Sequence, residues 1–231
     1  LGERARLDLW SGPAAWRRAG AEDPEALAAL DELLAALRAP ADPAALDRLA
    51  AVFDLEAAAR CAAIAVLVGS IHADRAHNHV WFFDPARGRL EPLLWDANGF
   101  GVHAEPELPV EVARHPLAER LLCDVRFVHR RNQILWDLLH GAGSAASLTV
   151  QVDRLLASFG GALRDDPEPV RLVLRRGVFQ TERLDGRQLA AAREEFAAFV
   201  TRREALLRAH FGDARATIEP HPENPAWSIV T

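Results

Sequence analysis

The helical spacing of apolar residues constrains the fold of this chain more than any other feature. In residues 25–38, leucines recur every three or four positions, which is the period of one face of an α-helix. Asp23 is suited to cap this helix, and Pro24 is suited to its first turn. The same spacing predicts further helices over residues 44–53, 55–68, 116–140, 148–163 and 187–211. We therefore expect a mostly helical protein.

Two stretches instead alternate apolar and polar residues, which is the period of a half-buried strand. RARLDLWSG, residues 4–12, predicts one strand near the start of the chain. HVWFF and RLEPLLW lie on either side of DPARG, whose proline and glycine suit a turn, and they predict an antiparallel hairpin. Trp81 and Trp95 in this hairpin are expected to pack in the core. Together with the helices, the hairpin predicts a mostly helical α+β fold.

The composition narrows the possible functions. Half of the 231 residues are hydrophobic, and the formal net charge of −6 provides no basic face for a nucleic acid. No apolar run approaches the roughly 20 residues of a membrane span, so none is expected. Cys61 and Cys123 lie in apolar helical contexts and are expected to be buried thiols rather than a disulfide. Arg130 and Arg131 are expected on a solvated helix face.

Polar side chains gather at both ends of the predicted hairpin. Asp74 and Asn78 precede its first strand, and Asp96 and Asn98 follow its second. If the strands pair, both ends return to the same edge, and the acids and amides converge there. Carboxylate and amide oxygens are hard ligands that suit Mg²⁺. This pattern is typical of phosphoryl transfer, in which one aspartate engages the attacking hydroxyl and an asparagine and a second aspartate hold metal.

The three histidines of the same stretch offer an alternative. His72, His77 and His79 resemble the start of a zinc site, with His103 as the nearby further ligand. A zinc-dependent hydrolase is therefore a competing hypothesis. Under the phosphoryl-transfer hypothesis, His72 would brace the loop that carries Asp74, and His79 would point outward from the strand.

HADRAHNHVWFFDPARGRLEPLLWDANGFG resembles the signature of the spore-coat protein H (CotH) kinases. In that family, an atypical branch of the protein-kinase-like fold, an Asp is followed by an Asn and an aromatic strand. A Pro-Trp-Asp-x-Asp segment then leads to Phe-Gly. HPLAERLLCDVRFVHRRNQILWDLL and FAAFVTRREALLRAHF resemble the helices that come later in the family. The resemblance covers residues 23–212.

The resemblance implies a role for each residue of the pattern. Asp74 would be the catalytic residue, Asn78 and Asp96 would hold the cofactor ATP with Mg²⁺ or Mn²⁺, and Asn98 would be a further metal ligand. The γ-phosphate would pass to a Ser or Thr of a protein substrate, for which a basic, serine-rich protein is one candidate. Residues 1–212 would form the C-terminal catalytic lobe of the kinase-like fold, and residues 213–231 a proline-rich tail.

Two departures from the family pattern support a second hypothesis. Asn98 stands where the family has an acid, and it brings no negative charge to a metal. The chain contains no lysine, and the family's N-terminal lobe, which supplies a basic residue to the nucleotide, is expected to be largely absent. The alternative is a catalytically impaired, kinase-like binding or structural module. The spore coat, the cell surface and the cytoplasm all remain open as its location, as does its oligomeric state.

Overall fold

The computed structural model describes residues 8–16, 23–40, 42, 44–70, 73, 78–95, 106–166, 170–175, 178–183, 185–212, 218–221 and 224–230. Its helices are η1 (Leu9–Ser11), η2 (Pro13–Ala15), α1 (Pro24–Arg38), α2 (Ala45–Val52), α3 (Leu55–Leu67), α4 (Pro116–Leu122), α5 (Val125–Leu139), α6 (Ala145–Asp165) and α7 (Gly186–Gly212). Its strands are β1 (Val80–Asp84), β2 (Arg89–Leu93), β3 (Val170–Arg175), β4 (Val178–Arg183), β5 (Ile218–His221) and β6 (Asn224–Val230). The mostly helical α+β fold that the sequence predicts is confirmed.

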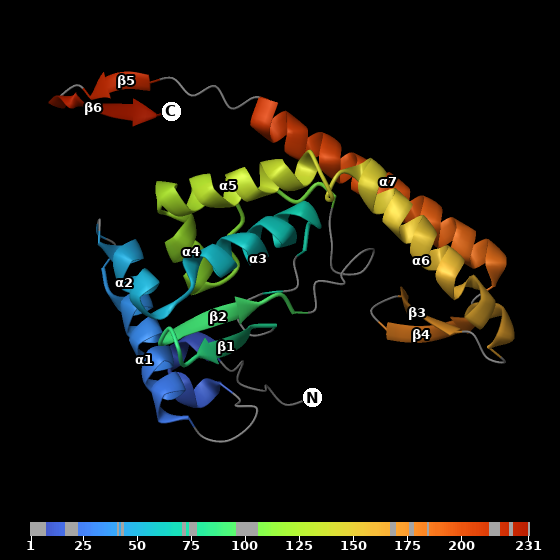
Figure 1. Ribbon diagram of the computed structural model, residues 1–231, viewed down its shortest axis with the longest axis horizontal. Helices are drawn as coiled ribbons and strands as arrows, with labels where there is room; N and C mark the ends of the chain where they lie inside the picture. The colour runs from blue at the N-terminus through green and yellow to red at the C-terminus, as the bar shows by residue number, and fades with distance from the viewer. Residues whose placement is uncertain are drawn as a thin grey trace.

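The helices around the predicted hairpin form one body (Figure 1). α3 packs against α5, and the β1–β2 hairpin packs against α3. α1 and α2 pack against each other and against β2 of the hairpin. α6 and α7 form a long pair that extends from this body toward the β3–β4 hairpin. The three hairpins are separate two-stranded antiparallel sheets.

The first helices form as their local sequence predicts. The Asp23 carboxylate accepts hydrogen bonds from the backbone N–H groups of Glu25 and Ala26, at 2.9 and 3.2 Å, and so caps α1. The leucine face of α1 is buried, with Leu33 and Leu34 almost without exposed surface. The predicted bounds of α1, α2, α3 and α7 agree with the structure to within one residue.

Two groups of buried side chains hold the body together. The larger one joins α1, α2, the start of α3, β2, α4 and the start of α5. It also includes Trp10, which precedes these elements in the chain. The smaller one joins the end of α3 to α5, α7 and the segment 106–112, and consists of Ala63, Val110, Leu135, Leu139 and Leu207. Because α7 comes from the far end of the chain, the second group fixes the C-terminal part of the domain to the helix that precedes the hairpin.

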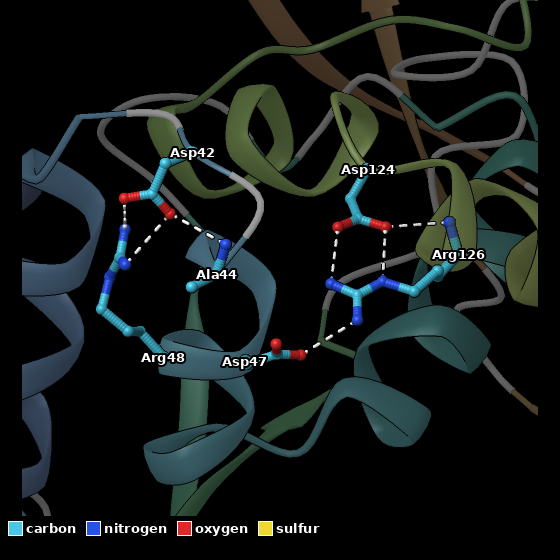
Figure 2. A network of polar contacts seen from close by, with 6 residues as sticks. All are labelled: Asp42, Ala44, Asp47, Arg48, Asp124 and Arg126. Atoms are coloured by element: carbon cyan, nitrogen blue, oxygen red, sulfur yellow. Dashed lines mark hydrogen bonds and ion pairs between the residues drawn. The ribbon is translucent and has the colours of Figure 1, made fainter. Parts of the chain in front are cut away.

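The predicted long helix over residues 116–140 is wrong in one respect, because it is two helices. α4 ends at Leu122, and Asp124 starts α5 as its N-cap by accepting a hydrogen bond from the Arg126 N–H at 2.9 Å. The Arg126 guanidinium then binds the Asp124 carboxylate and also Asp47 of α2 at 3.0 Å (Figure 2). A capping aspartate thus interrupts an apolar pattern that is otherwise continuous.

The predicted strand over residues 4–12 is also wrong within the described residues. Residues 9–11 and 13–15 form two short 3-10 helices. The Asp8 carboxylate accepts a hydrogen bond from the Trp10 N–H at 3.2 Å, which favours a turn over an extended strand. The turn directs Trp10 into the core, where its side chain is buried.

The later hairpins were not predicted. β3 and β4 pair from Val170 opposite Arg183 to Arg175 opposite Val178. Four of the six residues of VRLVLR are Val or Leu, and this short apolar run is compatible with a strand. β5 and β6 also pair, within residues 213–231, where a proline-rich tail was expected.

The two cysteines differ from expectation in their exposure. Cys61 is half-buried and Cys123 is exposed, and both thiols are free. The prediction that both are buried is therefore wrong, whereas the prediction that they do not pair is confirmed. In the part of the chain that the structure describes, no helix has the length and apolar character to cross a membrane.

Candidate functional site

The open end of the β1–β2 hairpin brings together the two chain segments that carry the predicted site. Val80 at the start of β1 pairs with Leu93 at the end of β2. The chain therefore enters the hairpin through Asn78 and leaves it through Trp95 at the same edge, and both residues line one cavity. This is the convergence that the sequence predicted for the two ends of the hairpin.

The predicted site residues themselves are described only in part. Asn78 lies in the described residues, at the mouth of the hairpin. Asp74, Asp96 and Asn98 lie outside them, and their roles remain predictions. Asp96 directly follows Trp95 in the chain.

Asn78 has an unusual backbone conformation. Its φ is +63°, and among the described residues it is the only non-glycine residue with a positive φ. This left-handed conformation costs an L-residue about 1 kcal/mol, and asparagine tolerates it better than most residues.

A cavity of about 210 Å³ lies next to the open end of the β1–β2 hairpin. α3, both strands of the hairpin, α4 and residues 108–115 surround it, and its wall is mostly apolar. Its polar lining residues are Cys61, Ser70, Asn78, His79, Arg114, His115 and Arg131. A mostly apolar wall with a few polar groups is typical of small-molecule sites, although the volume is below the roughly 300 Å³ at which such pockets usually begin.

His79 belongs to a cluster of aromatic rings on one side of this cavity, and the prediction that it points outward is wrong. Its ring lies 5.1 Å from the Trp10 ring and 4.5 Å from the His115 ring. Trp10 stacks on His115 at 5.2 Å, and Trp81 lies 4.1 Å from Trp16. The side chain of His79 therefore faces the first turns of the chain and the start of α4.

The two tryptophans of the hairpin have different environments. Trp81 is partly buried and packs against the main core, as expected. Trp95 is 58% exposed at the mouth of the cavity, so the expectation of a core role is wrong for this residue. It lies two residues beyond Leu93, the last paired residue of β2.

The zinc hypothesis depends on residues of which few are described. Of its four histidines only His79 is described, and its ring packs against aromatic neighbours. Within the described ranges, no three His, Cys, Asp or Glu side chains come together as a metal-binding group. His115, which the hypothesis did not include, accepts a hydrogen bond from the Ala118 N–H at 3.2 Å and caps α4.

The prediction that Arg131 is solvated is wrong. Its side chain is 1% exposed and lines the cavity, whereas Arg130 is exposed as expected. Both guanidinium terminal nitrogens of Arg131 donate to the Glu111 carboxylate, one of them at 3.1 Å, and Nη2 also donates to Asn132 Oδ1 at 2.7 Å. The pair holds the segment that leads into α4 against α5.

Asp54 fixes the hairpin to α3 from the other side. Its carboxylate caps α3 by accepting a hydrogen bond from the Ala57 N–H at 2.9 Å, and it binds the Arg87 guanidinium in the hairpin turn at 2.5 Å. Its backbone N–H donates to the Leu90 carbonyl of β2 at 2.8 Å. The sequence could have indicated the cap, because Asp54 precedes an apolar helix, but not its distant partners.

This arrangement defines a helical α+β protein in which a hairpin opens onto a mostly apolar cavity. The family model described as CotH kinase protein matches residues 14–207, which is most of the chain. The chain therefore belongs to the CotH kinase family and is a kinase-like protein. A kinase-like family indicates in general the use of ATP and a divalent metal. No curated protein matches this chain.

Proposed function

We propose that this chain is the catalytic lobe of an atypical protein kinase, which transfers the γ-phosphate of ATP to a Ser or Thr hydroxyl of a protein substrate. The observation that carries the proposal is the register of the hairpin. It places Asn78 and Trp95 at the open end of the hairpin, where both line the cavity. In the chain, Asp74 precedes Asn78 by four residues and Asp96 directly follows Trp95.

The residue types suit the reaction. Asn78, Asp96 and Asn98 carry oxygen donors, which are the ligands that Mg²⁺ and Mn²⁺ take in proteins. A bound metal ion would supply positive charge to the phosphate oxygens of ATP. Asp74 would orient the substrate hydroxyl and accept its proton. The mostly apolar cavity wall would exclude water from the same edge.

The lobe would consist of residues 1–212, with residues 213–231 as an appended segment. The match to the family model ends at residue 207, within α7, and so supports this division. The protein substrate would be basic and serine-rich, since a net charge of −6 favours basic partners.

A catalytically impaired binding or structural module is the second candidate, and the spore or cell surface is its candidate location. The observations that favour it are Asn98 in place of an acid and the absence of lysine from the chain. A module of this kind would keep the hairpin and its cavity but would bind nucleotide weakly or not at all.

The test uses the purified full-length protein with radiolabelled ATP, Mg²⁺ or Mn²⁺, and a basic, serine-rich protein. Asp96→Ala and Asp74→Asn should each lower phosphate transfer by at least ~10²-fold. Asp153→Asn is the matched control, because Asp153 lies on the exposed face of α6 and pairs only with Arg193 among the described residues. Unchanged activity in Asp96→Ala would contradict the proposal.

A second measurement separates the two candidates. The kinase should show a higher melting temperature with Mn²⁺ and ATP together, because binding to the folded state stabilises it. A protein without transfer activity and without this increase would instead be the binding or structural module.

A further inference from the structure

Arg203 of α7 is a buried cation that joins two distant segments of backbone. Its side chain is 1% exposed. Nε and Nη2 donate to the Val66 carbonyl at 2.9 and 2.6 Å, and Nη1 donates to the carbonyls of Pro106, at 3.1 Å, and Leu108. One guanidinium thus binds the end of α3 and the segment that leads toward α4.

The C-terminus of α3 favours a nearby positive charge. Gly69 adopts a φ of +60°, and the N–H groups of Gly69 and Ser70 bond the carbonyls of Val66 and Ala65 at 3.1 and 2.9 Å. These two bonds form a Schellman motif, which closes a helix and sets the direction in which the chain leaves it. The last turn of α3 contains no basic residue, so Arg203 supplies the positive charge that a helix C-terminus favours.

The guanidinium remains charged in this position. Burial lowers the pKa of Arg203 to about 10, with a smaller opposing effect from Glu107, so the group is protonated at neutral pH. A buried charge is costly unless its hydrogen bonds are satisfied, and here carbonyls from both segments satisfy them. Displacing either segment would leave donors of a buried cation without acceptors.

The two segments are those that lead into and out of the proposed site. α3 leads through Gly69 and Ser70 to Asp74 and Asn78, and Pro106 and Leu108 come after Asp96 and Asn98 in the chain. Val110 of the second segment also packs with Leu207, one turn beyond Arg203 on α7. Arg203 therefore binds the carbonyls of Val66 and Leu108, which line the same cavity as Asn78.

We propose that Arg203 is a positioning residue, which sets the spacing between the end of α3 and Leu108 in the wall of the cavity that Asn78 and Trp95 also line, and thereby the affinity of the proposed site for metal-bound nucleotide. The inference rests on the proposed kinase function. Arg203 would act through the backbone, because its described hydrogen bonds go to the carbonyls of Val66, Pro106 and Leu108.

The test compares variants of the full-length protein by calorimetric titration with Mn²⁺ and ATP. Arg203→Met removes the donors and the charge at similar volume, and should weaken binding by ~10-fold or more, as is usual when support of metal ligands is lost. Arg203→Lys keeps the charge but can reach only one of the two segments well, so it should bind with intermediate affinity.

Leu33→Ala is the control for stability. Leu33 has no exposed surface and lies on α1, in the other group of buried side chains, so its truncation lowers the free energy of unfolding without removing a contact to either segment. Its affinity for Mn²⁺ and ATP should stay within about twofold of the wild-type value, measured well below its melting temperature.

Three results would overturn the inference. Equal losses of affinity in Arg203→Met and Leu33→Ala would show that Arg203 acts through stability only. Wild-type affinity in Arg203→Lys, which tests the inference even if the Met variant does not fold, would show that the link between the segments is not needed. Absence of binding in the wild-type protein would contradict the proposed function as well, which distinguishes the two failures.

Discussion

Arg131 and Glu111 form a two-point ion pair in which the arginine is 1% exposed and the glutamate 44% exposed. The adjacent Arg130 also makes a two-point pair, through Nε and Nη2, with Glu56, at 2.8 and 2.7 Å, but on the surface. Two neighbouring arginines on α5 therefore offer a direct comparison of a buried and an exposed pair.

Glu111→Ala should lower the free energy of unfolding by about 2 kcal/mol, because it leaves the buried Arg131 charge without its carboxylate. The loss should be smaller than for a fully buried pair, since Asn132 Oδ1 remains as an acceptor. Glu56→Ala should cost less than about 1 kcal/mol, because water already solvates both partners. Urea unfolding measures both values, and equal losses would contradict the assignment of Arg131 as the structural residue.

Asp54 should contribute stability that depends on pH. Burial acts to raise its pKa, but the hydrogen bonds from the Ala57 N–H and Arg87 outweigh burial and leave the pKa lowered. A carboxyl with a lowered folded-state pKa stabilises the protein above its unfolded-state pKa of about 4, and this stability is lost as the pH falls through the folded-state value.

Asp54→Asn should therefore destabilise the protein at pH 7 and flatten the decline of stability below about pH 4. The measurement is the free energy of unfolding of the variant and the wild type across this range. Asp31→Asn, at an exposed position of α1, is the control, and it should follow the wild-type curve. If the variant and wild-type curves are parallel at acid pH, the Asp54 charge does not cause the decline of the free energy of unfolding there.

If the site binds metal as proposed, Asn98→Asp should tighten the binding of Mn²⁺ in the presence of ATP by roughly 10-fold, because metal affinity rises with the charge of the ligand set. Titration of Mn²⁺ into protein with ATP measures the change. Asn132→Asp adds the same charge on α5, beside Arg131, and should leave the Mn²⁺ affinity unchanged. Equal effects of the two substitutions would show that net charge, rather than coordination, is responsible.

The two thiols should differ in reactivity. Burial, with a smaller effect of Glu91, raises the pKa of the Cys61 thiol, and its Sγ lies 3.6 Å from the Pro92 carbonyl oxygen. Cys123 is exposed. A thiol-specific reagent at pH 8 should therefore modify Cys123 at least ~10-fold faster than Cys61, as followed by mass spectrometry. Cys123→Ser should leave one slow thiol, and a remaining fast phase would place Cys61 at the surface.

The sequence by itself determined the elements whose signals are local. The leucine spacing and the Asp23 cap predicted α1 to within one residue, and the alternation and the DPARG turn predicted the β1–β2 hairpin, although β2 ends at Leu93, two residues before the predicted end. The convergence of Asn78 and Trp95 followed from the same pattern, because antiparallel pairing returns both ends of a hairpin to one edge. Asp74, Asp96 and Asn98 remain predictions of this pattern and of the family resemblance.

Only the tertiary structure decided which polar residues are buried. Helical spacing places Arg131, unlike Arg130, on the same face as Phe127 and Leu135, but the partner that neutralises its buried charge, Glu111, lies on another segment. The inward orientation of His79 and the anchoring role of Arg203 likewise depend on Trp10 and on the Val66 carbonyl, which are far away in the chain. Local periodicity indicates which face of a helix or strand is apolar. Whether a charged side chain can be buried on that face depends on hydrogen-bond acceptors from distant segments, because an unpaired buried charge is costly.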